Sequence, residues 1–470
     1  MAEGLVHALG AFAATTRSAG LEPYLVQDAT KRVLDLVGNA LAATGEDPSE
    51  ITLAVTREAG GVPQATVFGE TDRLPAANAA LVNGTLAHAL DFDDTHLPSV
   101  LHPSASIIPA ALAVAEAEGT SGSEFLVAVA VGDEICVRLG MAAYDPDLGN
   151  SIFFENGLHA TSIVGTLGAA AAVATLLGLS AEQIAHAIGI AASMGAGLLE
   201  ANRTGGSVKR VHCGWAAHAG VTAALMARHG LTGPPTVLEG RFGFFRAYSE
   251  GRFDQGAILD GLGEVWELPR IFYKPYPTNH FTHAGIDAAL ALRARGLDPA
   301  EIEAIELGVP APVLRTIAEP PEEKARPLTP YHAKFSGPFT VATALVGGGG
   351  LGVYSDDFTE KTLRDPERLR LAGIVECVAD EAATAIFPNQ FPAVLTVRLR
   401  DGSEVSERIS HNRGGPDRPL SPDELATKFR LNAAHEIPAQ QVEVLKDAIG
   451  ALDDDPSVSK MMELTHRRQS

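Results

Sequence analysis

Over the first 260 residues the hydrophobic positions recur every three to four residues, the spacing of helices that bury one face. In residues 26–43 they include Val33, Leu36 and Leu41, and Gly45 follows as a stop signal. The same spacing predicts helices over residues 76–90, 107–118, 123–140, 162–178, 181–199 and 214–229. These segments are rich in alanine and glycine, so we expect closely packed helices with short side chains at their contacts.

After about residue 265 the pattern changes from helical spacing to alternation, which is typical of β-strands. Residues 302–309 (IEAIELGV) alternate in this way, and residues 395–409 form two alternating runs around Asp401-Gly402, which indicates a β-hairpin. Helical character returns after Ser421, an N-cap residue with Glu424 three positions on, as in a capping box.

These patterns predict a mainly α fold, and a chain of 470 residues is too long for one ordinary core. We expect a large all-helical domain built from both ends of the chain, residues 1–265 and 406–470. A smaller α+β lid domain would be inserted at residues 266–405. A cleft between two such domains is a natural binding site.

The charge and cysteine content of the chain limit the kinds of molecule it is expected to bind. The 36 Lys and Arg residues against 58 Asp and Glu residues give a net charge of −22, which argues against nucleic acid or an anionic membrane surface. Cys136, Cys213 and Cys377 are far apart and form no CxxC pair, so we expect neither a disulfide framework nor a zinc site. A reducing cytoplasm fits, and MAEGLVHALG lacks the features of a signal peptide. The uncharged residues 160–181 are expected to form a buried helix, not a membrane span.

The segment 87–112 carries an unusual density of acid and imidazole between two apolar helices: Asp91, Asp93, Asp94, Thr95, His96 and His102. One interpretation is a metal site formed by His88, Asp91, Asp93 and His96. No HExxH or EF-hand spacing supports it, and this mixture of ligands fits no standard set.

Three other interpretations of this segment compete. In the first, the carboxylates cap a solvated helix end, although negative charge at a helix C-terminus opposes the helix dipole. The letters DFDD match the proton donor of class II terpene cyclases, but those enzymes wrap carbocations in aromatic side chains and aromatics are only 6% of this chain. The third interpretation is an acid–base site for an anionic substrate, with His and Asp supplying proton transfer.

Three further segments favour the anion site, because each joins a cation or imidazole to a turn and then opens into a helix, whose N-terminus attracts anions. His159 precedes the apolar helix. Lys209, Arg210 and His212 follow a glycine pair, and Lys274, His280 and His283 lie at the expected domain boundary. In a net-acidic chain, four such segments predict a pocket for a small polyanion.

Seven ordered motifs resemble the MmgE/PrpD family over residues 10–435. In order along the chain they are NGTLAHALDFDDTH with LHPSASIIPAALAVAE, HATSIVGTLGAAAA, KRVHCGWAAHAG, GPPTVLEGRFGFF, YKPYPTNHFTHAGIDAA, AKFSGPFTVATAL and RPLSPDELATKF. That family includes 2-methylcitrate dehydratase, cis-aconitate decarboxylase and iminodisuccinate epimerase. The resemblance implies a helical domain with an α+β lid, a homodimer, and neither a metal nor an organic cofactor.

The resemblance also implies site residues, matched position by position. The catalytic set is Asp91, Thr95, His102 and His159, and the substrate-binding set is Lys209, Lys274 and His280, to which we add Arg203 as a further cation. Two departures stand out. The decarboxylases carry a tyrosine in the lid where residues 308–316 (GVPAPVLRT) have none, and the loop between Thr95 and His102 is one residue longer.

We therefore expect a cofactor-independent lyase of the 2-methylcitrate dehydratase kind, acting on a small di- or tricarboxylate by proton transfer at the carbon next to a carboxylate. His102 or His159 would be the base, and the other, assisted by Asp91, the acid. The lysines would hold the carboxylates. The alternatives are an epimerase or isomerase, a cis-aconitate-type decarboxylase, and a non-catalytic carboxylate-binding protein. The roles of Asp93 and Asp94 stay open.

Overall fold

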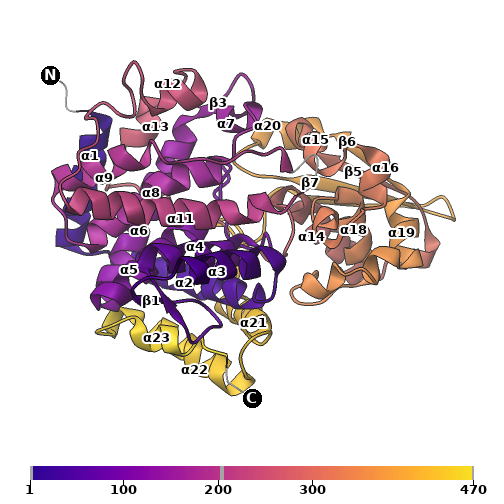
Figure 1. The fold of residues 1–470 in the computed structure, drawn as a ribbon. Coiled ribbons are helices and arrows are strands. Elements are labelled where there is room, and N and C mark those ends of the chain that lie inside the picture. The colour runs from indigo at the N-terminus through magenta and orange to yellow at the C-terminus, as the bar shows by residue number, and fades with distance from the viewer. Residues whose placement is uncertain (1–3, 202–205, 468–470) are drawn as a thin grey trace. The chain divides into compact units, whose positions relative to one another are not determined.

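The computed structural model describes residues 4–201 and 206–467 (Figure 1). The fold is mainly α, as the hydrophobic spacing predicted. The chain divides into two compact units, Met1–Ile271 together with Phe429–Ser470, and Phe272–Lys428. Each unit is described here by itself.

The first unit is built from helices, with two short two-stranded ladders. Its helices are α1 (Leu5–Ala19), α2 (Pro23–Ala42), α3 (Asp47–Ala59), α4 (Ala76–His88), α5 (Ser104–Glu118), α6 (Gly122–Ala142), α7 (Ile152–Glu155), α8 (Ala160–Leu176), α9 (Ala181–Ala191), α11 (His212–Arg228), α12 (Phe244–Ser249), α13 (Gln255–Leu259), α22 (Ala439–Gly450) and α23 (Ser459–Glu463). The ladders pair β1 (Ala65–Thr66) with β2 (Arg73–Leu74) and β3 (Tyr144–Asp145) with β4 (Asn150–Ser151).

Helix α8 is the centre of this unit, and it packs against α5, α6, α9 and α11. Residues Ala160 to Thr175 of α8 are all buried. Small side chains make this possible, since a Cβ added to Gly168 would lie 2.9 Å from the carbonyl oxygen of Gly132 in α6. The expected buried helix is thus present. None of the helices that the structure describes is both long enough and apolar enough to cross a membrane.

The second unit has a four-stranded sheet in the order β6-β5-β7-β8. The strands are β5 (Ile302–Val309), β6 (Val375–Ala379), β7 (Ala393–Leu399) and β8 (Glu404–Ile409). Strand β5 runs parallel to β6 and antiparallel to β7, and β7 pairs antiparallel with β8. The helices are α14 (His283–Ala294), α15 (Leu314–Ile317), α16 (Pro321–Ala325), α17 (Pro330–Ala333), α18 (Gly337–Val346), α19 (Pro366–Ala372) and α20 (Glu381–Ile386). Helix α21 (Pro422–Ala433) crosses the division of the chain.

Several local predictions are confirmed. The strand 302–309 and the hairpin around Asp401-Gly402 are present as β5 and as β7–β8. The capping box is present, with the Ser421 N–H donating to Glu424 Oε2 at 2.7 Å and the Glu424 N–H to Ser421 Oγ at 3.2 Å. The helix predicted over 181–199 is wrong beyond Ala191, because the chain turns at residues 192–194, just before Gly195 and Gly197.

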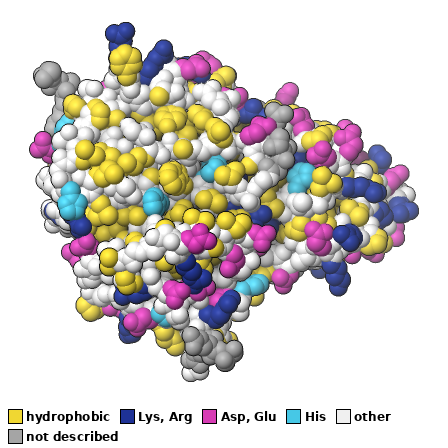
Figure 2. Space-filling view, in the orientation of Figure 1, with side chains coloured by type: hydrophobic (Ala, Val, Ile, Leu, Met, Phe, Trp, Pro, Cys, Tyr) yellow, Lys and Arg dark blue, Asp and Glu magenta, His cyan; other side chains and the backbone are white. Residues whose placement is uncertain are grey.

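Charged side chains of both signs are interspersed on the face shown in Figure 2, with hydrophobic side chains between them. A protein of net charge −22 disperses most of its acids over a solvated surface in this way. The charges and imidazoles that matter for chemistry are therefore those inside the fold.

Candidate active site

The acid-rich segment leaves α4 at His88 and closes into a small loop before α5. Asp91 has a φ of 56°, in the left-handed region that aspartate tolerates better than most residues. His96 and Leu101 pair as an antiparallel bridge, so the residues on either side of that bridge meet. Thr95 Oγ1 consequently lies 3.1 Å from His102 Nδ1. Val100 reaches a φ of 53° to close the loop, which is unusual for a β-branched residue.

His102 is held in one tautomer. Its Nδ1 lies 2.6 Å from the carbonyl oxygen of Asp94, and a carbonyl oxygen can only accept a hydrogen bond. Nδ1 must therefore carry a hydrogen, and in the neutral ring Nε2 is the basic atom. This is the state that a general base requires.

His159 precedes α8 and His212 begins α11, and their Nδ1 atoms lie 2.9 Å apart. One nitrogen donates a hydrogen and the other accepts it, so at least one ring of the pair is neutral. Burial, reinforced by Lys209 and His88, lowers the pKa of His159 well below its usual value. Burial, His88 and Lys209 lower the pKa of His212 to about 4. Both imidazoles are thus neutral near pH 7 and able to accept a proton.

Four histidine rings from different elements meet in this part of the unit. The ring centroid of His88 lies 5.5 Å from that of His102 and 5.7 Å from that of His159, and the His159 and His212 centroids are 5.1 Å apart. We call His88, His102, His159 and His212 the histidine cluster. Helices α4, α8 and α11 and the loop before α5 each contribute one member.

Lys209 brings a positive charge to the histidine cluster from the 3₁₀-helix η1 (Val208–Val211), just before α11. Its Nζ lies 3.1 Å from His88 Nε2 and 3.6 Å from Asp91 Oδ1. The side chain is buried, with 6% of its surface exposed. An ammonium in such a poorly solvated place attracts an anion far more strongly than one on the surface.

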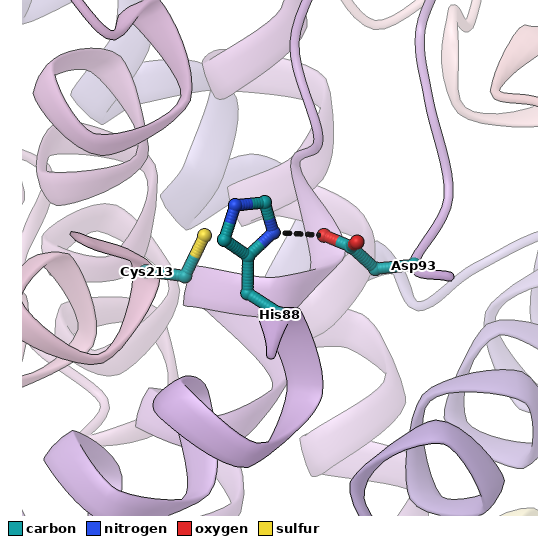
Figure 3. A group of neighbouring side chains, drawn as sticks. All are labelled: His88, Asp93 and Cys213. Atoms are coloured by element: carbon teal, nitrogen blue, oxygen red, sulfur yellow. Dashed lines mark hydrogen bonds and ion pairs between the residues drawn. The ribbon is translucent and has the colours of Figure 1, made fainter. Parts of the chain in front are cut away.

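Asp93 and Cys213 lie on opposite sides of the His88 ring (Figure 3), close enough together for their ligand atoms to share an ion. The donor set does not favour one. His88 Nδ1 is bonded to Asp93 Oδ2 at 2.8 Å and Nε2 to the Lys209 ammonium, so both ring nitrogens are engaged. Burial raises the pKa of the Cys213 thiol well above its usual value, so it is not the thiolate that binds metals.

Asp94 lies beneath the loop and anchors it. Its carboxylate accepts from Arg32 at 3.1 Å and from Ser104 Oγ at 2.5 Å, and Ser104 Oγ also lies 3.1 Å from Asp133 Oδ2. Burial raises the pKa of Asp94 to about 6 although Arg32 opposes the shift. Asp94 is therefore occupied by structural bonds, while its carbonyl orients His102.

Comparisons with known proteins show the family of this chain. The MmgE/PrpD N-terminal domain matches residues 7–255 and the C-terminal domain matches residues 276–454. The chain belongs to the MmgE/PrpD family. It is 31% identical to the human cis-aconitate decarboxylase over 443 residues, 92% of this chain and 88% of the relative. It is 27% identical to the cis-aconitate decarboxylase of Aspergillus terreus over 415 residues, 85% of this chain and 83% of the relative. It is 25% identical to the 2-methylcitrate dehydratase of Escherichia coli K12 over 405 residues, 80% of this chain and 79% of the relative.

The resemblance to the MmgE/PrpD family is thereby confirmed, and five of the seven residues that it implies lie in the first unit. They are Asp91, Thr95, His102, His159 and Lys209, and the contacts above bring them together. Lys274 and His280 belong to the second unit, where both side chains are buried. Arg203 lies outside the described residues.

Two residues weighed for the segment 87–112 and its neighbours have partners outside the histidine cluster. His96, considered as a metal ligand, is bonded through Nδ1 to Ser99 and through Nε2 to Glu267. Arg210 forms an ion pair with Glu46 at 2.9 Å. The proposed set of His88, Asp91, Asp93 and His96 is therefore wrong as a coordination sphere, because His96 already has partners elsewhere.

The site residues that the resemblance implies do not include His88, Asp93 or His212. His88 and Asp93 were weighed only as metal ligands, and His212 lies in one of the segments that predict the anion pocket. The signal in the sequence was an imidazole at the end of a mostly apolar helix, since His88 is the last residue of α4 and lies one turn before Asp91. His212 likewise opens a helix of alanine and glycine. A histidine in such a helix needs a polar partner, and only the fold shows which one it has. His88 bonds Asp93 and Lys209, and His212 bonds His159.

Proposed function

We propose that this MmgE/PrpD protein is a lyase that needs no organic cofactor and eliminates water from a small di- or tricarboxylate. The observation that carries the proposal is the pairing of a buried ammonium with two separately held imidazoles, His102 and His159. Elimination requires a base for one proton, an acid for the leaving group and a cation for the charge between them. The histidine cluster and Lys209 offer all three.

The first step is removal of a proton from the carbon next to a carboxylate. That carbon is weakly acidic, so its negative charge must be stabilised as it develops, and the Lys209 ammonium would bind the carboxylate that receives it. His159 suits the base, because its lowered pKa keeps the ring unprotonated at neutral pH. The C–H electron pair then forms the carbon–carbon double bond as the C–O bond to the neighbouring hydroxyl breaks.

The second proton goes to the leaving hydroxyl, which departs as water. His102 suits this role when it is protonated on Nε2, since the Asp94 carbonyl holds Nδ1–H and directs Nε2 away from the backbone. Thr95 Oγ1, 3.1 Å from the same ring, would help to fix its orientation. Asp91 Oδ1, 3.6 Å from Lys209 Nζ, would keep that ammonium charged and in place.

Decarboxylation is the second candidate, because the relatives at 27% to 31% identity are named cis-aconitate decarboxylases. In that reaction the bond to carbon dioxide breaks and one imidazolium protonates the resulting carbanion, so a single proton donor suffices. A pair of distinct imidazoles favours dehydration. The lack of tyrosine in residues 308–316 separates this chain from the decarboxylase pattern.

A panel of di- and tricarboxylates incubated with the protein in heavy water tests the proposal, with mass spectrometry and NMR as readouts. Loss of water supports a dehydratase, loss of carbon dioxide a decarboxylase, and deuterium exchange with inversion an epimerase. We expect the same rate with and without EDTA, because both nitrogens of His88 are engaged by Asp93 and Lys209. Binding of a carboxylate without any of the three reactions would overturn the proposal in favour of a binding protein.

A further inference from the structure

We propose that His88 and Asp93 are positioning residues, which aim the Lys209 ammonium at the substrate without touching the substrate. The inference rests on the proposed function, in which Lys209 binds a carboxylate. His88 and Asp93 have no role in that mechanism, yet both are buried, with 0% and 1% of their surfaces exposed. Burying a polar group is costly unless the group is hydrogen-bonded, so we expect this buried, hydrogen-bonded pair to have a function.

The directions of the hydrogen bonds follow from the atoms. An ammonium has only hydrogens to give, so His88 Nε2, 3.1 Å from Lys209 Nζ, must accept. A neutral imidazole that accepts at Nε2 carries its hydrogen on Nδ1, which donates to Asp93 Oδ2 at 2.8 Å. Lys209, His88 and Asp93 therefore form a chain of hydrogen bonds running in one direction, with the carboxylate fixing the tautomer of the ring.

This arrangement suits a lysine whose charge must remain available. Lysine is a point charge on a flexible four-carbon stem, so an acceptor is needed to hold it in one place. A carboxylate in hydrogen-bonding contact would hold it but would also neutralise it and compete with the substrate. Neutral imidazole accepts a hydrogen without taking the charge, and Asp91 Oδ1, at 3.6 Å, forms an ion pair with the ammonium that is longer than a usual charge-assisted hydrogen bond.

The helices keep the two partners in register. His88 is the last residue of α4, and Lys209 lies three residues before α11. The two helices touch without intervening side chains, since a Cβ added to Gly84 would lie 2.8 Å from Gly214 Cα. One turn beyond that contact on α4 is His88, so the distance from its ring to Lys209 depends on rigid backbone.

A pair of substitutions tests the inference. His88→Leu removes the acceptor for Lys209, whereas the amide oxygen of His88→Gln can reach the position of Nε2. We expect His88→Leu to raise KM about tenfold or more and to lower kcat, because Lys209 is no longer held in position. His88→Gln should bring both constants most of the way back to their wild-type values. Asp93→Asn, which leaves the ring in place but no longer fixes its tautomer, should fall between them. Equal losses in His88→Leu and His88→Gln would overturn the proposal.

The decisive control is the same substitution without the lysine. In a protein that already carries Lys209→Met, adding His88→Leu should lower kcat/KM by less than about twofold. The effects of two substitutions do not add when one residue acts through the other. The same loss in both backgrounds would show that His88 acts independently of Lys209. Circular dichroism and melting temperature identify any variant that fails to fold, in which case Asp93→Asn and His88→Gln carry the test.

One readout is independent of turnover. NMR of protein labelled with ¹⁵N-histidine should show the His88 ring with its hydrogen on Nδ1, assigned by the signal missing from His88→Gln. The opposite tautomer in the wild type would overturn the hydrogen-bond chain. If the tautomer is as expected but no carboxylate is turned over, the proposed function fails and the positioning of Lys209 stands.

Discussion

The contact between His159 and His212 distinguishes a catalytic role of His159 from a structural one. It is the N-cap residue of α8, a position where a polar side chain commonly bonds the first free N–H groups of a helix. Its side chain makes no such bond, and instead faces His212 at 2.9 Å. The ring is therefore directed toward the histidine cluster and not toward the helix that follows it.

His159→Asn should accordingly lose activity and keep stability. Asparagine is close to imidazole in size and can hydrogen-bond, but it does not accept a proton near neutral pH. We expect kcat to fall by about 10²–10⁴-fold, the usual worth of general acid–base catalysis, while the melting temperature hardly moves. His218→Asn is the matched control, since His218 bonds the Ala77 carbonyl and stacks on Trp215 outside the cluster. A loss of about 1 kcal/mol in stability with kcat unchanged would instead identify His159 as a helix cap.

Helices α4 and α11 carry His88 and Cys213 on facing surfaces, and glycine lets them approach. A Cβ on Gly214 would lie 2.1 Å from the carbonyl oxygen of Leu81, so any side chain there must push backbone against backbone. The richness in alanine and glycine seen along the chain thus serves the site as well as the core, because it sets how near α4 and its histidine come to Lys209.

Gly214→Ala should disturb both stability and activity. We expect the free energy of unfolding to fall by about 1–3 kcal/mol, as for other overpacked contacts, and kcat/KM to fall by about 10- to 100-fold as His88 and Lys209 separate. Gly450→Ala is the control, because a Cβ there meets nothing within 4 Å. Urea denaturation and steady-state kinetics on the two variants measure both effects, and full activity in Gly214→Ala would mean that the helix contact does not govern the site.

Elements whose signals are local could be predicted from the sequence, and those that depend on distant partners could not. Strand β5, the β7–β8 hairpin and the capping box after Ser421 each follow from neighbouring residues. Strand β6 was not predicted, because its short sequence VECVA joins β5 in parallel across a long connection. A parallel pairing leaves no turn signal to read.

The site divides in the same way. The acidic segment with Thr95 and His102 was predictable, since its polar residues stand together between apolar helices. The meeting of His88, His159 and His212 was not, because they are separated by 53 or more residues and lie on three helices whose packing alone unites them. A sequence pattern shows which faces are buried but not which faces meet.

The molecule as a whole holds two classes of buried titratable group that respond oppositely to acid. Burial lowers the pKa values of His96, His159 and His212, so the unfolded chain binds protons below about pH 6.5 that the folded state refuses. These groups make stability fall as the pH falls. Burial raises the pKa of Asp94 to about 6, so this carboxyl makes stability fall as the pH rises through about 4 to 6. Burial also raises the pKa of Asp133 well above its usual value, which acts in the same direction.

Removing one histidine should expose its part of this balance. The pKa of His212 is about 4 in the folded protein and about 6.5 in the unfolded chain, so its destabilising contribution is absent above about pH 6.5 and grows as the pH falls toward 4. Urea denaturation between pH 7.5 and 4.5 should therefore show His212→Asn losing less stability on acidification than the wild type. His411→Asn, at an exposed position, should follow the wild-type curve. Parallel curves for all three proteins would mean that His212 titrates in the folded state as it does in the unfolded chain. Burial would then not lower its pKa, and the His159–His212 pair would not be held neutral as the proposed base requires.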